Sequence, residues 1–110
     1  MRLPNGHAAI IEFAKIRDYC LSPIHLRGRH KARVFFSALG MTSAHSNELC
    51  AALAGAARDG AASIGESDSY GTRYMIDFEL TRNDRRAMIR SWWIIRSGEN
   101  VPRFVTCFVR

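Results

Sequence analysis

The chain has 110 residues, of which 47% are hydrophobic and 24% charged, and its formal net charge at pH 7 is +6. This composition is typical of a globular domain that folds around one core without metal or disulfide staples, and it excludes an intrinsically disordered chain. We therefore expect a single domain over residues 1–110. A pI of about 9.9 favours an acidic partner, of which nucleic acid is the commonest kind.

The cysteine content and the hydropathy of the sequence indicate the cellular compartment of the protein. Cys20, Cys50 and Cys107 are odd in number and widely spaced, so we expect free thiols in a reducing compartment and no structural zinc site. The N-terminus lacks the apolar core of a signal peptide, and no apolar run approaches the roughly 18 residues of a membrane-spanning helix. The sequence thus predicts a cytoplasmic protein with no membrane partner, no metal and no other cofactor. A domain cut from a larger secreted polypeptide would also lack a signal of its own.

The N-terminal segment is predicted to hold a strand and a helix. After a turn at Pro4–Gly6, the short apolar run over residues 8–12 favours a strand. Residues 13–21 have apolar side chains at helical spacing, and Ser22–Pro23 ends that helix because a residue before proline avoids the helical region.

Two further helices are predicted before residue 60. The first opens within residues 25–33 and ends at Gly40, which suits a left-handed cap. The second is expected over about residues 47–59, where many alanines favour a helix. Each carries one apolar stripe facing the core. The stripes are Ala32, Phe35, Phe36 and Leu39 in the first, and Leu49, Cys50, Leu53 and Ala57 in the second.

After Gly60 the apolar pattern changes from helical to alternating. It predicts a weak strand over 61–64 and stronger strands over 71–80, 87–96 and 103–109, with turns at Asn83–Asp84 and 97–100. Short turns between strands indicate an antiparallel meander. We therefore expect an α+β fold in which an N-terminal strand and two to three helices pack on a four-stranded antiparallel sheet. Trp92 and Trp93 cannot share a face of their strand. Core packing against a helix is expected for both, and the alternative for one of them is an interface or base-stacking role.

A block of positive charge opens the second predicted helix. Six of the nine residues from His25 to Arg33 are basic, and no Asp or Glu occurs between Tyr19 and Asn47. Such a block indicates either a site for an anion such as phosphate or a solvated surface. The candidate phosphate-binding residues are Arg27, Arg29 and Arg33.

Several short phrases of the sequence, taken together, resemble a small bacterial family of uncharacterised domains. They include Leu3-Pro4-Asn5, Tyr19–Pro23, Gly28–Phe35, Tyr70–Tyr74, Trp93–Ile95 and Phe104–Thr106. Members of that family occur as stand-alone proteins beside a small antitoxin-like partner and as C-terminal domains of polymorphic toxins. Family members often end with an aromatic-Pro pair after the last threonine, whereas residues 106–110 here contain no proline.

The family in turn is similar to the barnase–EndoU–colicin–RelE group of ribonuclease toxins, which places one or two helices ahead of a four-stranded antiparallel sheet. The resemblance implies a metal-independent endoribonuclease toxin whose partners are RNA and a cognate antitoxin or immunity protein. The oligomeric state stays open.

RNA cleavage without a metal needs a base for the ribose 2′-OH, an acid for the leaving 5′-oxygen and a cation beside the phosphorane. His30 is the candidate base or acid, because its ordinary pKa of about 6.5 suits proton transfer. Lys31 and Arg73 are candidate phosphate clamps, and Tyr70 and Thr106 are candidate hydrogen-bond donors.

Each candidate also has a structural interpretation. His30 can be a solvent-facing helix residue, Arg73 can form a cross-strand ion pair, and Tyr70 can pack in its turn. Two other functions therefore stay open, a non-enzymatic RNA-binding module and a protein-interaction module such as the immunity half of a pair. Convergence of the candidate residues in one concavity favours the enzyme, whereas dispersal over different faces favours the other two.

Overall fold

The computed structural model describes residues 1–110 throughout and has an α+β fold, as predicted. One antiparallel sheet contains the four strands in sequence order. They are β1 (Ala62–Asp68), β2 (Gly71–Arg82), β3 (Arg85–Arg96) and β4 (Arg103–Val109). The helices are α1 (Phe13–Lys15), which continues as the π-helical turn η2 (Ile16–Cys20), then α2 (Arg29–Leu39) and α3 (Ser46–Asp59). The 3₁₀ turns η1 (Gly6–Ala8) and η3 (Ser43–His45) complete the elements.

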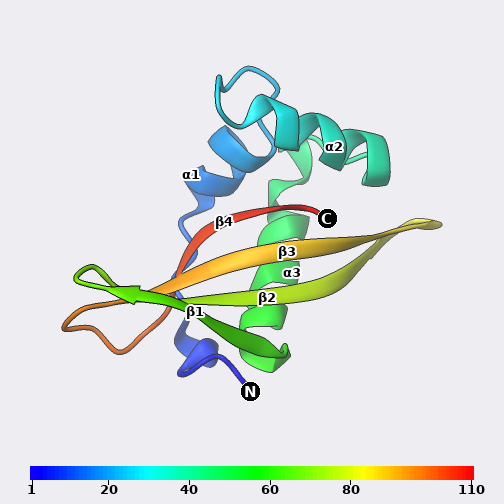
Figure 1. Ribbon diagram of the computed structural model, residues 1–110. Helices are drawn as coiled ribbons and strands as arrows, with labels where there is room; N and C mark the ends of the chain where they lie inside the picture. Colours follow the sequence, from blue (N-terminus) through cyan, green and yellow to red (C-terminus); the bar gives the residue numbers. More distant parts are fainter.

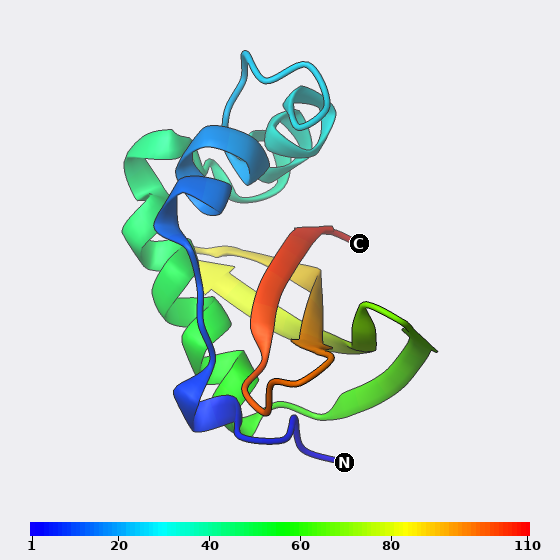
Figure 2. The same ribbon diagram turned by 90° about the vertical axis from the view of Figure 1, so that its left-hand side faces the viewer.

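The helices leave one face of the sheet uncovered. In Figure 1, α3 crosses behind β2 and β3, and α2 lies beyond the edge formed by β4. Figure 2 shows α1 and α3 together on one side of the sheet, while the sheet curls toward the other side at β1. None of the helices has the length and apolar character that spanning a bilayer requires.

The core is centred on Trp93, which has no exposed surface. Its indole N–H donates to Ser91 Oγ over 2.9 Å, and Ser91 Oγ donates in turn to the backbone carbonyl of Ile76 over 2.8 Å. The Phe104 ring meets the indole edge-on at 5.4 Å between centroids. Every polar group in this chain of contacts is therefore paired, as burial in an apolar core requires.

Trp92 lies on the opposite face of β3, so the expectation of core packing was wrong for this residue. It is only half-buried. Alternation of side chains along a strand forces adjacent tryptophans to opposite faces. At the open face, β1 bulges close to Trp92, and a Cβ added to Gly65 would lie 3.4 Å from its ring.

Residues 8–12, which were predicted to form an N-terminal strand, do not form one. Residues 6–8 form η1, and Ile10 alone makes one parallel bridge to Arg103. The backbone N–H of Ile10 donates to Pro102 O, and the N–H of Phe104 donates to Ile10 O. A run of five residues is too short for its apolar pattern to distinguish a strand from an extended segment that crosses the edge of β4.

Helix α2 begins and ends close to the predicted positions. The His25 ring nitrogen Nδ1 accepts hydrogen bonds from the N–H groups of Arg27 and Gly28, and the helix follows at Arg29. Gly40 ends it with a left-handed φ of 66°, which favours glycine. Phe36 differs from the prediction, because 59% of its surface is exposed outside the buried stripe.

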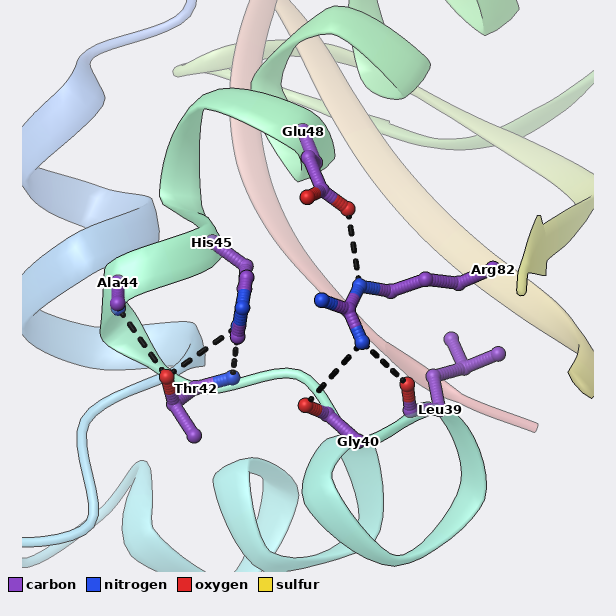
Figure 3. A network of polar contacts seen from close by, with 7 residues as sticks. All are labelled: Leu39, Gly40, Thr42, Ala44, His45, Glu48 and Arg82. Atoms are coloured by element: carbon purple, nitrogen blue, oxygen red, sulfur yellow. Dashed lines mark hydrogen bonds and ion pairs between the residues drawn. The ribbon is translucent and has the colours of Figure 1, made fainter.

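Arg82 joins α2, α3 and the β2–β3 hairpin. Its Nη1 donates to the last carbonyls of α2, at Leu39 and Gly40, and its Nε donates to Glu48 in the first turn of α3 (Figure 3). The capping box of η3 lies in the same connection, where the Thr42 hydroxyl accepts from the Ala44 N–H and the His45 ring accepts from the Thr42 N–H. These contacts fix the orientation of α2 relative to the sheet.

Gly28 fixes the other end of α2. A Cβ added to Gly28 would lie 2.2 Å from the backbone carbonyl oxygen of Tyr19, which cannot move without displacing η2. We expect Gly28→Ala to lower the free energy of unfolding by about 1–3 kcal/mol, the usual cost of overpacking. Urea unfolding followed by circular dichroism measures this.

Gly55→Ala is the matched control. Gly55 lies inside α3, where an added Cβ meets only the end of the Arg58 side chain at 3.9 Å. Alanine should there raise the free energy of unfolding by about 0.5–1 kcal/mol, because glycine loses more backbone entropy in a helix. Equal effects of the two substitutions would show that the contact between Gly28 and Tyr19 is unimportant.

Candidate active site

The uncovered face of the sheet carries polar and aromatic side chains from three strands. The register of the strand pairs and the alternation of side chains along each strand place them on the side of the sheet away from α3. We call this surface the open face. Its residues are Arg73, Met75, Asp77 and Glu79 of β2, Arg90, Trp92 and Ile94 of β3, and Thr106 and Phe108 of β4.

Lys31 of α2 reaches the edge of the open face. Its ammonium nitrogen lies 3.4 Å from Thr106 Oγ1 and sits over the rings of Tyr19 and Phe108, at 5.4 and 5.5 Å from their centroids. No carboxylate pairs with it, since Lys31 takes part in none of the ion pairs of the protein. Aromatic faces attract a cation without neutralising it, so the charge of Lys31 stays available to an anion.

His30 and Lys31 border one concavity. It has a volume of about 310 Å³ and is lined also by Val34 of α2 and by Phe108 and Val109 of β4. His30 is exposed, and its ring makes no hydrogen bond within the protein. The structure therefore brings Lys31 and Thr106 together and places His30 beside Lys31 at this concavity, which Thr106 does not line.

Arg73 shares the open face but lies farther along it. Thr106 pairs with Trp92 and Trp92 with Met75, so Arg73 is two strands and two residues from Thr106. The strand spacing and the rise per residue place the two Cα atoms roughly 12 Å apart. The Nη1 of Arg73 donates to Asp68 across 2.9 Å. Asp68 is the last residue of the neighbouring strand β1, so Arg73 forms the cross-strand ion pair of its structural interpretation. At that distance Arg73 can contact a neighbouring phosphate of a bound chain.

Tyr70 does not join this group. It lies in the turn between β1 and β2 with 74% of its surface exposed, and its backbone N–H donates to Asp68. The turns after β1 and β3 lie at the opposite end of the sheet from the β2–β3 hairpin (Figure 1).

The three candidate phosphate-binding arginines of the basic block also lie apart from Lys31. Arg27, Arg29 and Arg33 are exposed and take part in no ion pair. Arg29 and Arg33 line a different cavity, on another side of α2. The five candidate catalytic residues and these arginines thus do not converge in one pocket.

A partly exposed charge cluster that the sequence patterns did not single out lies on the open face. Asp77 accepts hydrogen bonds from Nε and Nη2 of Arg90, at 2.9 and 3.0 Å, and from Nη1 of Arg110 at 2.8 Å. The sequence could have predicted the pair of Asp77 and Arg90 from the register of the hairpin. A turn at Asn83–Asp84 places Arg82 opposite Arg85, and five residues from the turn on each strand Asp77 then faces Arg90. Two arginines thus share the carboxylate of Asp77, and Glu79 lies two residues farther along the same face of β2.

Acid should weaken this cluster. The hydrogen bond from Arg90, with the charge of Arg110, holds the pKa of Asp77 below its usual value. The contribution of the ionised carboxyl to the free energy of unfolding is therefore complete above the unfolded-state pKa of about 3.9, and it is lost as the pH falls through the lower native pKa. Asp77→Asn should be less stable than wild type at neutral pH and lose less stability on acidification to about pH 3.

Urea unfolding at a series of pH values tests this prediction, with Glu66→Gln as the control. Glu66 is exposed in β1 and has no ion-pair partner. Its substitution should leave the acid dependence of stability unchanged. Parallel pH profiles for wild type and Asp77→Asn would contradict the assignment.

Two cysteines lie beside Lys31. All three cysteines are free, as predicted, and Cys20 and Cys107 are fully buried, whereas Cys50 is half-buried. A hydrogen bond from the Cys107 thiol, with smaller effects of Thr106 and Lys31, lowers the pKa of Cys20 to about 7. The same interaction raises the pKa of Cys107 well above its ordinary value. No three His, Cys, Asp or Glu side chains gather in a group that suits a metal ion.

This architecture defines an α+β domain with a four-stranded antiparallel sheet, one face of which is open. The chain belongs to the family described as a domain of unknown function, DUF6883, whose model matches residues 2–110. No curated protein matches it.

Among solved structures, the chain is similar to one described as a contact-dependent growth inhibition toxin–immunity protein complex from Klebsiella pneumoniae 342. The sequence identity is 14% and the TM-score 0.68, over 92% of this chain and 99% of that chain. At this identity the likeness shows a shared fold.

Proposed function

We propose that this chain is a metal-independent endoribonuclease toxin that acts in the cytoplasm and is neutralised by a cognate antitoxin or immunity protein. The observation that carries the proposal is the unpaired ammonium group of Lys31, held between two aromatic rings and beside Thr106 at the open face. The fold shared with a chain from a toxin–immunity complex and the net charge of +6 support the same function.

The proposed reaction is attack of a ribose 2′-OH on the adjacent phosphorus. His30 accepts the 2′-hydroxyl proton, the new P–O bond forms, and the bond to the 5′-oxygen breaks. The leaving 5′-oxygen takes a proton from a water molecule, and the hydroxide left behind takes the proton held on His30. The products are a 2′,3′-cyclic phosphate and a free 5′-hydroxyl, and His30 is neutral again. Lys31 stabilises the charge that builds on the phosphorane, and the Thr106 hydroxyl donates to a phosphate oxygen. Arg73 holds a neighbouring phosphate.

Expression in a bacterial host tests the toxin proposal. The wild-type chain should slow growth and degrade cellular RNA, and His30→Ala should relieve both effects while the variant stays folded and soluble. Arg58→Gln is the control, because Arg58 is exposed on α3 and pairs only with Asp59. Normal growth and intact RNA on expression of the wild type would overturn the proposal.

Two observations favour a second candidate, an RNA-binding module without catalysis. The candidate residues do not converge in one pocket, which by the criterion set from the sequence favours a binding module over an enzyme. The His30 ring has no protein partner that fixes its tautomer or orientation, as a positioned base usually has. If the chain is such a module, its affinity for RNA falls as the salt concentration rises and is unchanged by His30→Ala, and the bound RNA is not cleaved.

A further inference from the structure

A second cavity lies on another side of α2. It has a volume of about 280 Å³ and lies between α2 and the segments around residues 21–23 and 41–43. Its floor is apolar and includes the buried side chains of Leu21, Ala32 and Met41. The exposed ring of Phe36 lines it as well. An apolar concavity with a few polar groups is the usual form of a small-molecule site.

Two arginines give this cavity an uncompensated positive charge. Arg29 and Arg33 are one helical turn apart and both line it. Neither takes part in any ion pair, and no Asp or Glu occurs between residues 19 and 47. The Ser43 side chain, which makes no hydrogen bond within the protein, lines the same cavity. Two guanidinium groups facing one hollow favour an anion with several acceptor oxygens.

This cavity is separate from the candidate active site. The concavity beside β4 is lined by His30, Lys31 and Val34, and the second cavity by Arg29, Arg33 and Phe36, so the two share no lining residue. The angular spacing of about 100° per residue places the two sets on different sides of α2. Binding in the second cavity therefore requires no contact with the catalytic candidates.

We propose that the second cavity binds a nucleoside monophosphate unit, either a free nucleotide or one nucleotide of an RNA chain. The base lies against the Phe36 ring and the apolar floor, and the phosphate lies between Arg29 and Arg33. A base stacks favourably on an aromatic side chain, and an arginine binds phosphate oxygens in a forked geometry. Inorganic phosphate leaves the apolar floor unused, and an uncharged nucleoside leaves the guanidinium groups unused.

Titration of the full chain, followed by calorimetry and by amide NMR shifts, tests this site. The probes are adenosine 5′-monophosphate, adenosine, inorganic phosphate and a 2′-O-methyl tetranucleotide, which cannot be cleaved through its 2′-position. We expect the monophosphate to bind at least about tenfold more tightly than adenosine or phosphate, and to weaken as salt rises. Tighter binding of the tetranucleotide than of the monophosphate assigns the site to RNA, and the reverse assigns it to a free nucleotide.

Variants locate the binding. The double variant Arg29→Gln, Arg33→Gln should weaken monophosphate binding at least about tenfold, and Phe36→Ala should weaken it without changing phosphate binding. Arg58→Gln on α3 should bind as wild type does. Equal affinity for adenosine and its monophosphate, no binding at millimolar monophosphate, or unchanged binding in the double variant would each overturn the proposal. Failure of RNA cleavage leaves this test intact, because none of the probes depends on cleavage.

Discussion

Lys31→Met should lower the rate of RNA cleavage by about 10²–10³-fold, the usual effect of removing one group that stabilises a developing oxyanion. Methionine keeps an unbranched apolar side chain between the Tyr19 and Phe108 rings but lacks the charge. The free energy of unfolding should change little, so the loss of rate reports on the ammonium group. Single-turnover cleavage of a labelled RNA measures the rate, and urea unfolding measures stability.

Lys15→Met is the matched control for this prediction. Lys15 also approaches β4, but its ammonium group donates to the Phe104 carbonyl over 3.1 Å instead of meeting Thr106. Lysines beside an edge strand protect it from pairing with other chains, and Lys15 fits that structural role. If both variants slow cleavage equally, Lys31 acts only as an edge lysine and not at the phosphorane.

Trp93→Ala should have the largest effect on stability, a loss of about 3–5 kcal/mol in the free energy of unfolding. The substitution empties the centre of the core and removes the edge-on contact with Phe104. It also removes the indole N–H donor to Ser91 Oγ. Ser91→Ala should cost about 1–3 kcal/mol, because it leaves that buried N–H unpaired.

Trp92→Ala provides the comparison. Trp92 is half-buried at the open face and lies close to the bulge of β1, so its loss removes less buried apolar surface and should cost clearly less than the loss of Trp93. Urea unfolding of both variants under identical conditions measures the difference. Equal costs would contradict the assignment of the two faces of β3.

The strands were predictable because their patterns have a period of two and are bounded by turn residues. The hairpin at Asn83–Asp84 sets the register of β2 and β3, and the left-handed φ of 56° at Asn83 is one that asparagine tolerates. The weak strand predicted over 61–64 extends to Asp68 as β1, because pairing with β2 continues past the bulge between Ile64 and Ser67. No local pattern in Ser63–Asp68 shows that extension, since these residues are all exposed.

The candidate site was only partly predictable. Proximity in sequence joins His30 to Lys31, but the contact between Lys31 and Thr106 spans 75 residues and depends on where α2 lies relative to β4. That position is set by the Arg82 contacts and the close approach at Gly28, neither of which has a periodic signal in the sequence. Helical spacing shows that Arg29 and Arg33 share one side of the helix, but it cannot show which side of α2 faces β4. Arg29 and Arg33 were therefore grouped with residues from which the structure separates them.

Incubation of the purified chain with a labelled RNA in EDTA tests the central claim most directly, with wild type and Lys31→Met side by side. Wild type should cut the RNA without a metal ion and leave 2′,3′-cyclic phosphate and 5′-hydroxyl ends, and Lys31→Met should leave nearly all of the RNA uncut at the same time point. Intact RNA with the folded wild type, or cleavage that leaves other end groups or proceeds equally in both proteins, would contradict a nuclease centre at Lys31.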